Sequence, residues 1–195
     1  MYTEPRSWWA GSLMVNSDGT CAAAVAGNVA QFACEKVNEL GGKVVAMSDS
    51  SGYIYDPEGI STEKLEYIKE LKNIKRGRIS EYAKEYRCDF HKGRPWYVKC
   101  DVALPCATQN EINAKEAEML VSNSVIAVAE GANMPCTPEA IEVFHKNGIL
   151  FAPGKASNAG GVATSGLEMS QNSLRLSWTR EEVDERLHSI MVNIH

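Results

Sequence analysis

The sequence predicts an α/β fold in which a doubly wound, mostly parallel sheet carries helices on both faces. Short apolar runs of strand length alternate with longer segments whose apolar residues recur at helical spacing, in the order β-α-β-α-α-β-α-β-α-β-α. Such alternation is typical of parallel strands joined by right-handed crossovers. With 195 residues and 44% apolar content, the chain is long enough to bury one substantial core.

Composition and charge exclude several classes of protein. The formal net charge of -5 comes from interspersed acids and bases, so we expect no nucleic-acid partner. No apolar run approaches about 18 residues, so we expect no membrane partner and a cytoplasmic protein. The six cysteines form no C-x-x-C pair and have no histidine at zinc-ligand spacing, which predicts free thiols and no metal.

Residues 1–19 differ from the rest of the chain. They mix proline, tryptophan, glycine and asparagine without periodicity, so we expect an irregular N-terminal arm. Residues 20–195 are then expected to form a single domain.

That domain opens with a strand, turn, helix and strand. The strand Cys21–Ala26 is followed by a helix from Val29, which two glycines end, and by a second strand at Lys43–Ser48. Asp49 follows Gly27 by 22 positions. This spacing is typical of the βαβ unit that binds a dinucleotide in Rossmann-like folds, where the acid lies beside the adenosine ribose.

The glycine signature of that unit is incomplete. G-x-G-x-x-G/A requires glycine at position 25, where the chain has Val25. A β-branched residue there would cost on the order of 1 to 3 kcal/mol if φ were positive. Two hypotheses therefore stand: a cofactor-binding unit, and a non-catalytic Rossmann-like domain that binds no cofactor. A Rossmann-type methyltransferase shares the βαβ start but leaves the later loops unexplained.

A helix with a capping serine is predicted from Ser61, and a basic cluster follows it. The cluster is near enough in sequence to fold back on the Asp49 loop. It is either a solvated helix end or a cationic contact for a 2′-phosphate on the adenosine ribose. Its members are Lys72, Lys75, Arg76 and Arg78.

The second half continues the alternation. Strands are expected at Val98–Leu104, Val125–Ala129 and Ile149–Phe151. Helices are expected at Ile79–Tyr86, at Ala114–Val121 with Asn113 as its cap, from Thr137-Pro138, and at Glu181–Ile194. A further helix is predicted to carry Met169, Leu174, Leu176 and Trp178 at core-like spacing.

Polar loops follow three of these strands, at Cys106–Asn110, Gly131–Asn133 and Gly154–Ser165. In a parallel sheet such loops gather along one edge, where doubly wound folds bind ligands. The third is rich in glycine and small side chains, which permit close approach of the backbone to a ligand or close helix–strand packing.

Three segments together, Asp101–Asn110, Ala129–Pro135 and Ala152–Asn172, resemble the cofactor domain of glutamate dehydrogenase of the hexameric, microbial kind. The resemblance covers roughly Gly27 to His195. It implies reversible oxidative deamination of L-glutamate to 2-oxoglutarate and ammonia by hydride transfer. NADP is the cofactor it implies, with NAD possible, and the parent assembly is a homohexamer.

The resemblance also implies roles for single residues. On the cofactor side, Gly27, Asn28 and Val29 would face the pyrophosphate, Asp49 would lie by the adenosine ribose, and Ala107, Asn133 and Asn158 would line the nicotinamide side. Ser50 and Lys72 would contact the 2′-phosphate. On the substrate side stand Val162, Ser165 and Asn158. Because an ionised Asp49 repels a phosphate, NADP preference requires charge compensation from the Lys72 region.

The resemblance leaves the catalytic residues outside the chain. In the family the substrate domain precedes the dinucleotide domain and holds the catalytic lysine and the proton-shuttling acid. We therefore expect a domain truncated at both ends relative to the family, with no catalytic residue of its own, and inactive by itself.

Overall fold

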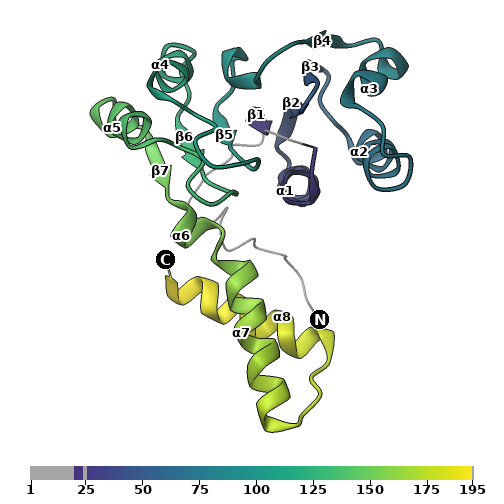
Figure 1. Ribbon diagram of the computed structural model, residues 1–195, viewed down its shortest axis with the longest axis vertical. Coiled ribbons are helices and arrows are strands. Elements are labelled where there is room, and N and C mark those ends of the chain that lie inside the picture. Colours follow the sequence, from purple (N-terminus) through teal and green to yellow (C-terminus); the bar gives the residue numbers. More distant parts are fainter. Residues whose placement is uncertain (1–19, 24–25, 195) are drawn as a thin grey trace.

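The computed structural model describes residues 20–23 and 26–194, and within them a seven-stranded sheet lies between the helices of the upper part of the molecule in Figure 1. The strand order is β4-β3-β2-β1-β5-β6-β7. β1 pairs in parallel with β2 and β5, as do β5 with β6 and β6 with β7, whereas β3 runs antiparallel to β2 and β4. The strands are Thr20–Ala23, Lys43–Asp49, Gly52–Tyr55, Asp89–His91, Val102–Leu104, Ala127–Ala129 and Leu150–Ala152.

This arrangement confirms the α/β class and the mostly parallel sheet. The predicted arm, residues 1–19, lies outside the described residues, and so does Val25.

The helices begin where the capping residues predict. Ser61, Asn113 and Thr137 accept hydrogen bonds from backbone N–H groups three residues on, at 3.3, 3.1 and 3.3 Å. The helices are α1 Asn28–Glu39, α2 Thr62–Lys69, α3 Ile79–Tyr86, α4 Ala114–Ser122, α5 Pro138–Lys146, α6 Gly154–Ser157, α7 Ala159–Leu174 and α8 Arg180–Ile194. A π-helical turn, η1 Glu70–Ile74, and a 3-10 turn, η2 Pro95–Tyr97, complete them.

The core has two layers because successive residues of a strand point to opposite faces. In β6, Ala127 and Ala129 pack with α1, α2 and α3, whereas Val128 packs with α4 and α5. β5 alternates in the same way, with Ala103 on the α4 side. Burying both faces of the sheet fixes the positions of the loops at its strand ends.

Two strands were not predicted. β3 and β4 form the antiparallel edge of the sheet. Only Ser50 and Ser51 separate β2 from β3, a spacing that fits a hairpin. Both strands are too short, at four and three residues, to show a clear alternation.

The prediction for the glycine-rich segment was also wrong. Its residues form α6 and the first turns of α7 rather than a loop. Small side chains there allow the helix but give it little to bury, and none of the α7 residues is buried.

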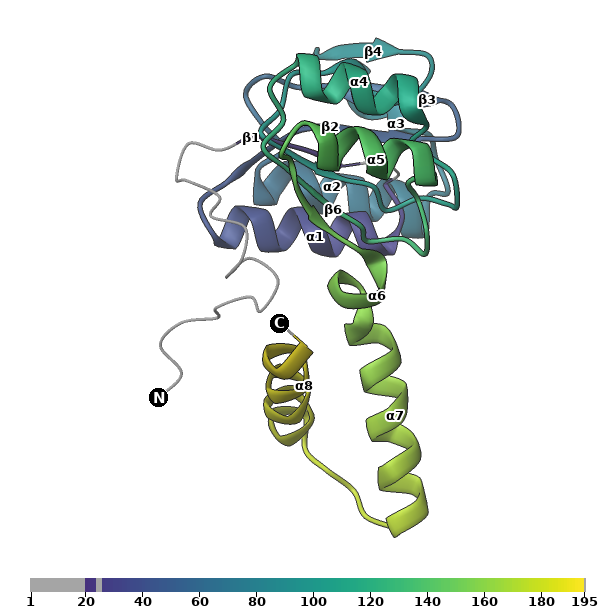
Figure 2. The same cartoon turned by 90° about the vertical axis from the view of Figure 1, so that its left-hand side faces the viewer.

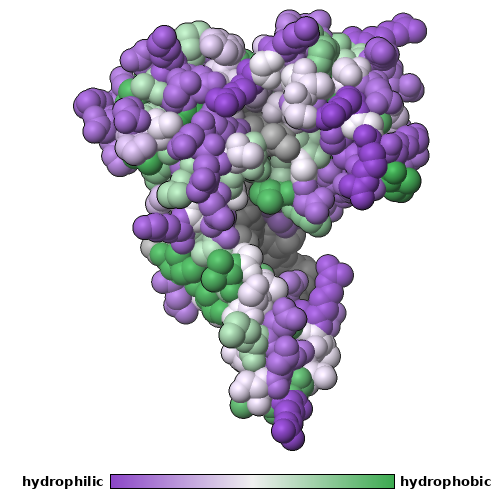
Figure 3. Space-filling model, viewed as in Figure 1, coloured by the Kyte–Doolittle hydropathy of each residue, from purple (hydrophilic) through white to green (hydrophobic). Residues whose placement is uncertain are grey.

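The α7–α8 pair projects away from the sheet beyond β7 (Figures 1 and 2). The core role predicted for Met169, Leu174 and Leu176 is therefore wrong: these side chains are 72%, 61% and 54% exposed. Figure 3 shows apolar surface where the C-terminal part of α8 lies beside α7.

Candidate functional site

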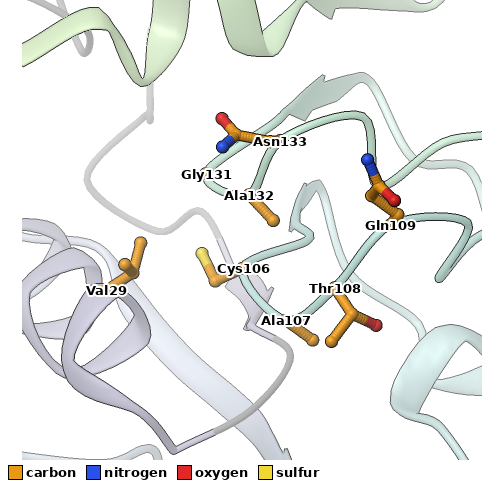
Figure 4. A pocket seen from close by; sticks show the side chains of 8 residues that line it. All are labelled: Val29, Cys106, Ala107, Thr108, Gln109, Gly131, Ala132 and Asn133. Carbon is orange, nitrogen blue, oxygen red and sulfur yellow. The ribbon is translucent and has the colours of Figure 1, made fainter. Parts of the chain in front are cut away.

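A hollow of about 390 Å³ lies where the start of α1 meets the loops that follow β5 and β6. Three predicted cofactor residues, Val29, Ala107 and Asn133, line it together (Figure 4). Gly27 and Asn28 form the N-terminal end of α1, directly before Val29. The other lining residues are Cys106, Thr108, Gln109, Gly131 and Ala132.

The loops pack so closely that Gly131 has no room for a side chain. A Cβ at this position would lie 2.6 Å from Cys106 Sγ and 3.2 Å from Val29 Cγ1. Burial raises the pKa of the Cys106 thiol to about 12, so the group is uncharged at neutral pH and acts as packing.

Gly131→Ala should lower the free energy of unfolding by about 1–3 kcal/mol, because the added methyl overlaps Cys106. Truncating that thiol in a Gly131→Ala, Cys106→Ala double variant should recover much of the loss. Urea unfolding of both single variants and the double variant gives the coupling between the two sites.

Gly161→Ala is the matched control. An added Cβ meets nothing within 4 Å there, and the position is helical, so a gain of about 0.5–1 kcal/mol is expected. Additive effects at positions 131 and 106 would contradict the proposed overlap.

The three segments predicted to gather along one edge of the sheet do lie together, and an asparagine of each takes part in the contacts. Asn158 Nδ2 donates to Asn133 Oδ1 at 2.8 Å and to the carbonyl oxygen of Ala132 at 3.1 Å. The backbone N–H of Asn110 donates to the carbonyl of Met134 at 3.1 Å. The loops after β5 and β6 and the α6–α7 junction therefore meet at one border of the hollow.

Asp49 ends β2 and is 9% exposed. Its Oδ1 accepts from the backbone N and the Oγ of Ser51, at 2.8 and 2.6 Å. Its Oδ2 accepts from Lys72 Nζ and from the backbone N of Ile79, both at 2.8 Å. Burial alone would raise the pKa of this carboxyl, but the hydrogen bonds from Lys72, Ser51 and Ile79 together lower it to about 2.

The basic cluster does fold back on the Asp49 loop. Lys72 bonds to Asp49 and also donates to the carbonyl oxygen of Gly77 at 3.0 Å. Its charge thus offsets that of Asp49, the compensation that NADP binding was expected to require. Arg78 Nη1 donates to Ser50 Oγ, and both of these residues are exposed.

A second buried acid supports the loop after β5. Glu111 is 3% exposed, and its Oε2 accepts from the backbone N–H groups of Ala107 and Thr108 at 2.8 and 3.3 Å. Burial raises the pKa of Glu111 to about 7, although those hydrogen bonds and the charge of Arg94 oppose the rise. The carboxyl therefore titrates near neutrality.

The predicted substrate residues lie on the α6–α7 segment. Asn158 joins the two helices, and Val162 and Ser165 follow at spacings of four and three, which puts all three on one helical face. Val162 is 78% exposed, and Ser165 Oγ donates to the carbonyl of Gly161 at 3.3 Å. This face is open in the part of the molecule that the structure describes.

The structure adds residues that the sequence analysis did not single out. Arg78 was placed in the basic cluster but not among the predicted contacts, and Glu111 and Glu130 were not considered. The sequence did indicate a role for Glu130, because this acid directly follows an apolar strand. A charge at such a buried position is costly unless hydrogen-bond donors or an opposite charge compensate it.

Over residues 20–23 and 26–194, no group of three or more histidine, cysteine or acidic side chains is arranged to hold a metal ion. In the same part of the chain, no helix is both long and apolar enough to cross a membrane.

Comparison with known proteins gives the family. A model of the Glutamate/Leucine/Phenylalanine/Valine dehydrogenase family matches residues 14–195. The chain belongs to that family. It is 65% identical over 170 residues to the NAD(P)-specific glutamate dehydrogenase of Xylanibacter ruminicola, covering 87% of the chain and 38% of that protein. It is 56% identical over 170 residues to the NADP-specific glutamate dehydrogenase of Escherichia coli, with the same coverage of each.

A solved structure shares the fold. The crystal structure of Plasmodium falciparum glutamate dehydrogenase matches with a TM-score of 0.87 and 46% identity, over 96% of this chain and 41% of that one. The chain thus spans about two fifths of the length of these relatives. The family match gives no support to the alternative of a non-catalytic domain.

Proposed function

We propose that this chain is the cofactor-binding part of an NADP-dependent glutamate dehydrogenase, built as a Rossmann-like doubly wound domain. The observation that carries the proposal is the hollow of about 390 Å³ bordered by the start of α1 and the loops after β5 and β6. Doubly wound sheets bind dinucleotides at such a crevice, outside the carboxyl ends of the strands.

The residues at this edge fit an NADP molecule. Gly27, Asn28 and Val29 at the start of α1 would hold the pyrophosphate, as helix N-termini hold anions. Ala107 and Asn133 in the hollow, with the adjacent Asn158, would line the nicotinamide side. NADP, when bound, supplies the hydride acceptor, and the protein supplies position and electrostatics.

The end of β2 would hold the adenosine side. Asp49 would lie by the ribose, and its charge is balanced by Lys72. Ser50 would contact the 2′-phosphate, and Arg78, which bonds to Ser50, adds a second exposed donor there. In this arrangement Lys72 acts mainly through Asp49, and Arg78 is the cation that decides between NADP and NAD.

The whole protein would interconvert L-glutamate with 2-oxoglutarate and ammonia in the cytoplasm, as a homohexamer. Val162 and Ser165, with Asn158, would contact the substrate from the open face of α7.

NADPH should bind to this chain saturably, with a change in its fluorescence. Arg78→Ala should weaken NADPH binding by about tenfold to a hundredfold, since a hydrogen bond to a charged group contributes about 1.5–3 kcal/mol. NADH, which has no 2′-phosphate, should bind the variant and the parent alike. Titration of both cofactors against both proteins measures this.

Arg180→Ala removes an exposed arginine at the start of α8 and serves as the matched control. Absence of saturable NADPH binding by the parent would refute the proposed function. Equal weakening of NADPH and NADH by Arg78→Ala would refute the role of Arg78 alone.

A further inference from the structure

A buried carboxylate connects the segments that border the hollow. Glu130 follows β6 directly and is 4% exposed. Its Oε2 accepts from the backbone N–H of Gly154 at 2.7 Å, and its Oε1 accepts from the backbone N–H of Cys136 at 3.2 Å. A Cβ on Gly154 would lie 2.9 Å from the carbonyl oxygen of Ala132, so α6 is seated directly against the loop after β6.

Two further hydrogen bonds join the same segments. Ser157 Oγ, at the end of α6, donates to the carbonyl oxygen of Glu130 at 2.6 Å. Asn158 Nδ2 donates to Asn133 Oδ1 at 2.8 Å. Asn133 and Asn158 are therefore joined directly, and the segments that carry them are also joined through the side chain and the backbone carbonyl of Glu130.

The chemistry of the site requires a carboxylate. Both oxygens face backbone N–H donors, so both must be acceptors. Glutamine has the same shape but one acceptor oxygen, and its NH₂ group would face one of the two N–H groups. An apolar residue would leave two buried N–H groups unpaired.

We propose that Glu130 is a positioning residue, which holds the loop carrying Asn133 and the helix start carrying Asn158 as one rigid border of the cofactor site. The inference rests on the proposed function, because Glu130 acts on the cofactor only through those two side chains. Loss of either carboxylate bond would let α6 and α7 move relative to the loop.

Hydrogen exchange of single backbone amides, followed by NMR on the chain, tests the proposal without any cofactor. In Glu130→Gln the amides of Gly154 and Asn158 should exchange about tenfold faster than in the parent, as expected for loss of a hydrogen bond to a charged group. Amides of β2 should exchange at the parent rate. Acceleration of all amides alike would indicate a purely structural role and would overturn the proposal.

Glu116→Gln is the matched control, because Glu116 is also buried and its Oε2 also accepts from a backbone N–H, that of Asn113 at 2.9 Å. It lies on α4, and its removal should leave Gly154 and Asn158 at parent rates. If Glu130→Gln does not fold, Glu130→Asp keeps the charge but is one methylene shorter, which draws the carboxylate away from both N–H groups, and it should accelerate the same two amides. Parent rates in the folded variant would refute the proposal.

Cofactor titration separates this inference from the proposed function. Glu130→Gln should weaken the binding of NADPH and of NADH by the same factor, because Glu130 does not face the 2′-phosphate. Arg78→Ala should weaken the binding of NADPH alone. Unchanged affinity for both cofactors would overturn the positioning role. If the parent binds neither cofactor, the proposed function fails, and the positioning role of Glu130 toward the cofactor fails with it, whatever the exchange rates show.

Discussion

Asp49→Ala should lower the free energy of unfolding by about 3–5 kcal/mol, the cost of breaking a buried ion pair by removing one partner. The Asp49 and Lys72 side chains are 4% and 18% exposed, so little solvent screens the pair. The substitution leaves the Lys72 ammonium without its carboxylate and the buried N–H of Ile79 without an acceptor. Urea unfolding at neutral pH measures the loss.

An exposed ion pair provides the control. Glu142 and Lys146 lie on α5 with side chains 70% and 73% exposed, so Glu142→Ala should cost well under about 1 kcal/mol. A similar cost for both variants would contradict the buried-pair interpretation.

The contribution of Asp49 to stability should also depend on pH, because folding lowers the pKa of its carboxyl from 3.8 to about 2. The stabilisation should be present in full above about pH 4 and should be lost as the pH falls through 2.

Glu111 should give the opposite pH dependence, with a loss of stability on the order of 3 kcal/mol as the pH rises from about 4.5 to about 7. Burial raises its folded pKa from 4.5 to about 7, so the folded state binds the proton more tightly than the unfolded chain. The stabilisation is complete below the unfolded pKa and disappears as the pH rises through 7. The positive charge of Arg94 lowers the pKa of Glu111 and so opposes the shift, whereas the negative charge of Glu116 raises it further.

Urea unfolding of the parent and of Glu111→Gln at several values between pH 5 and pH 8 isolates this effect. The variant, which has no proton to lose, should lack the slope that the parent shows over this range. Glu118→Gln, on the exposed side of α4, should keep the slope. The same slope in the parent and in Glu111→Gln would show that Glu111 does not titrate near neutrality.

Much of the architecture was predictable from local chemistry. Capping residues such as Asn113 and Thr137 predict the start of a helix, because their side chains accept hydrogen bonds from backbone N–H groups that the helix leaves unpaired. The meeting of Asn133 and Asn158 followed from topology, since loops at the carboxyl ends of neighbouring parallel strands share one edge.

Other features depend on contacts that local sequence does not encode. β3 and β4 are strands because they complete the edge of a sheet that other segments build, and three or four residues carry too little pattern to show it. The segment from Gly154 was expected to be a loop because of its glycines. In the structure it is helical, and its seat against Ala132 accounts for the glycine at its start.

By itself, the sequence determined the α/β class, the order of the main elements and the residues offered at the sheet edge, because periodicity, caps and strand-end loops are local properties of the chain. Only the tertiary structure decided how the charges there are used. Lys72 is paired with Asp49, Arg78 donates a hydrogen bond to Ser50, and Glu130 joins the loop after β6 to the start of α6. Such pairing depends on distances between residues that are far apart in sequence. Those distances are fixed only when helices pack on both faces of the sheet.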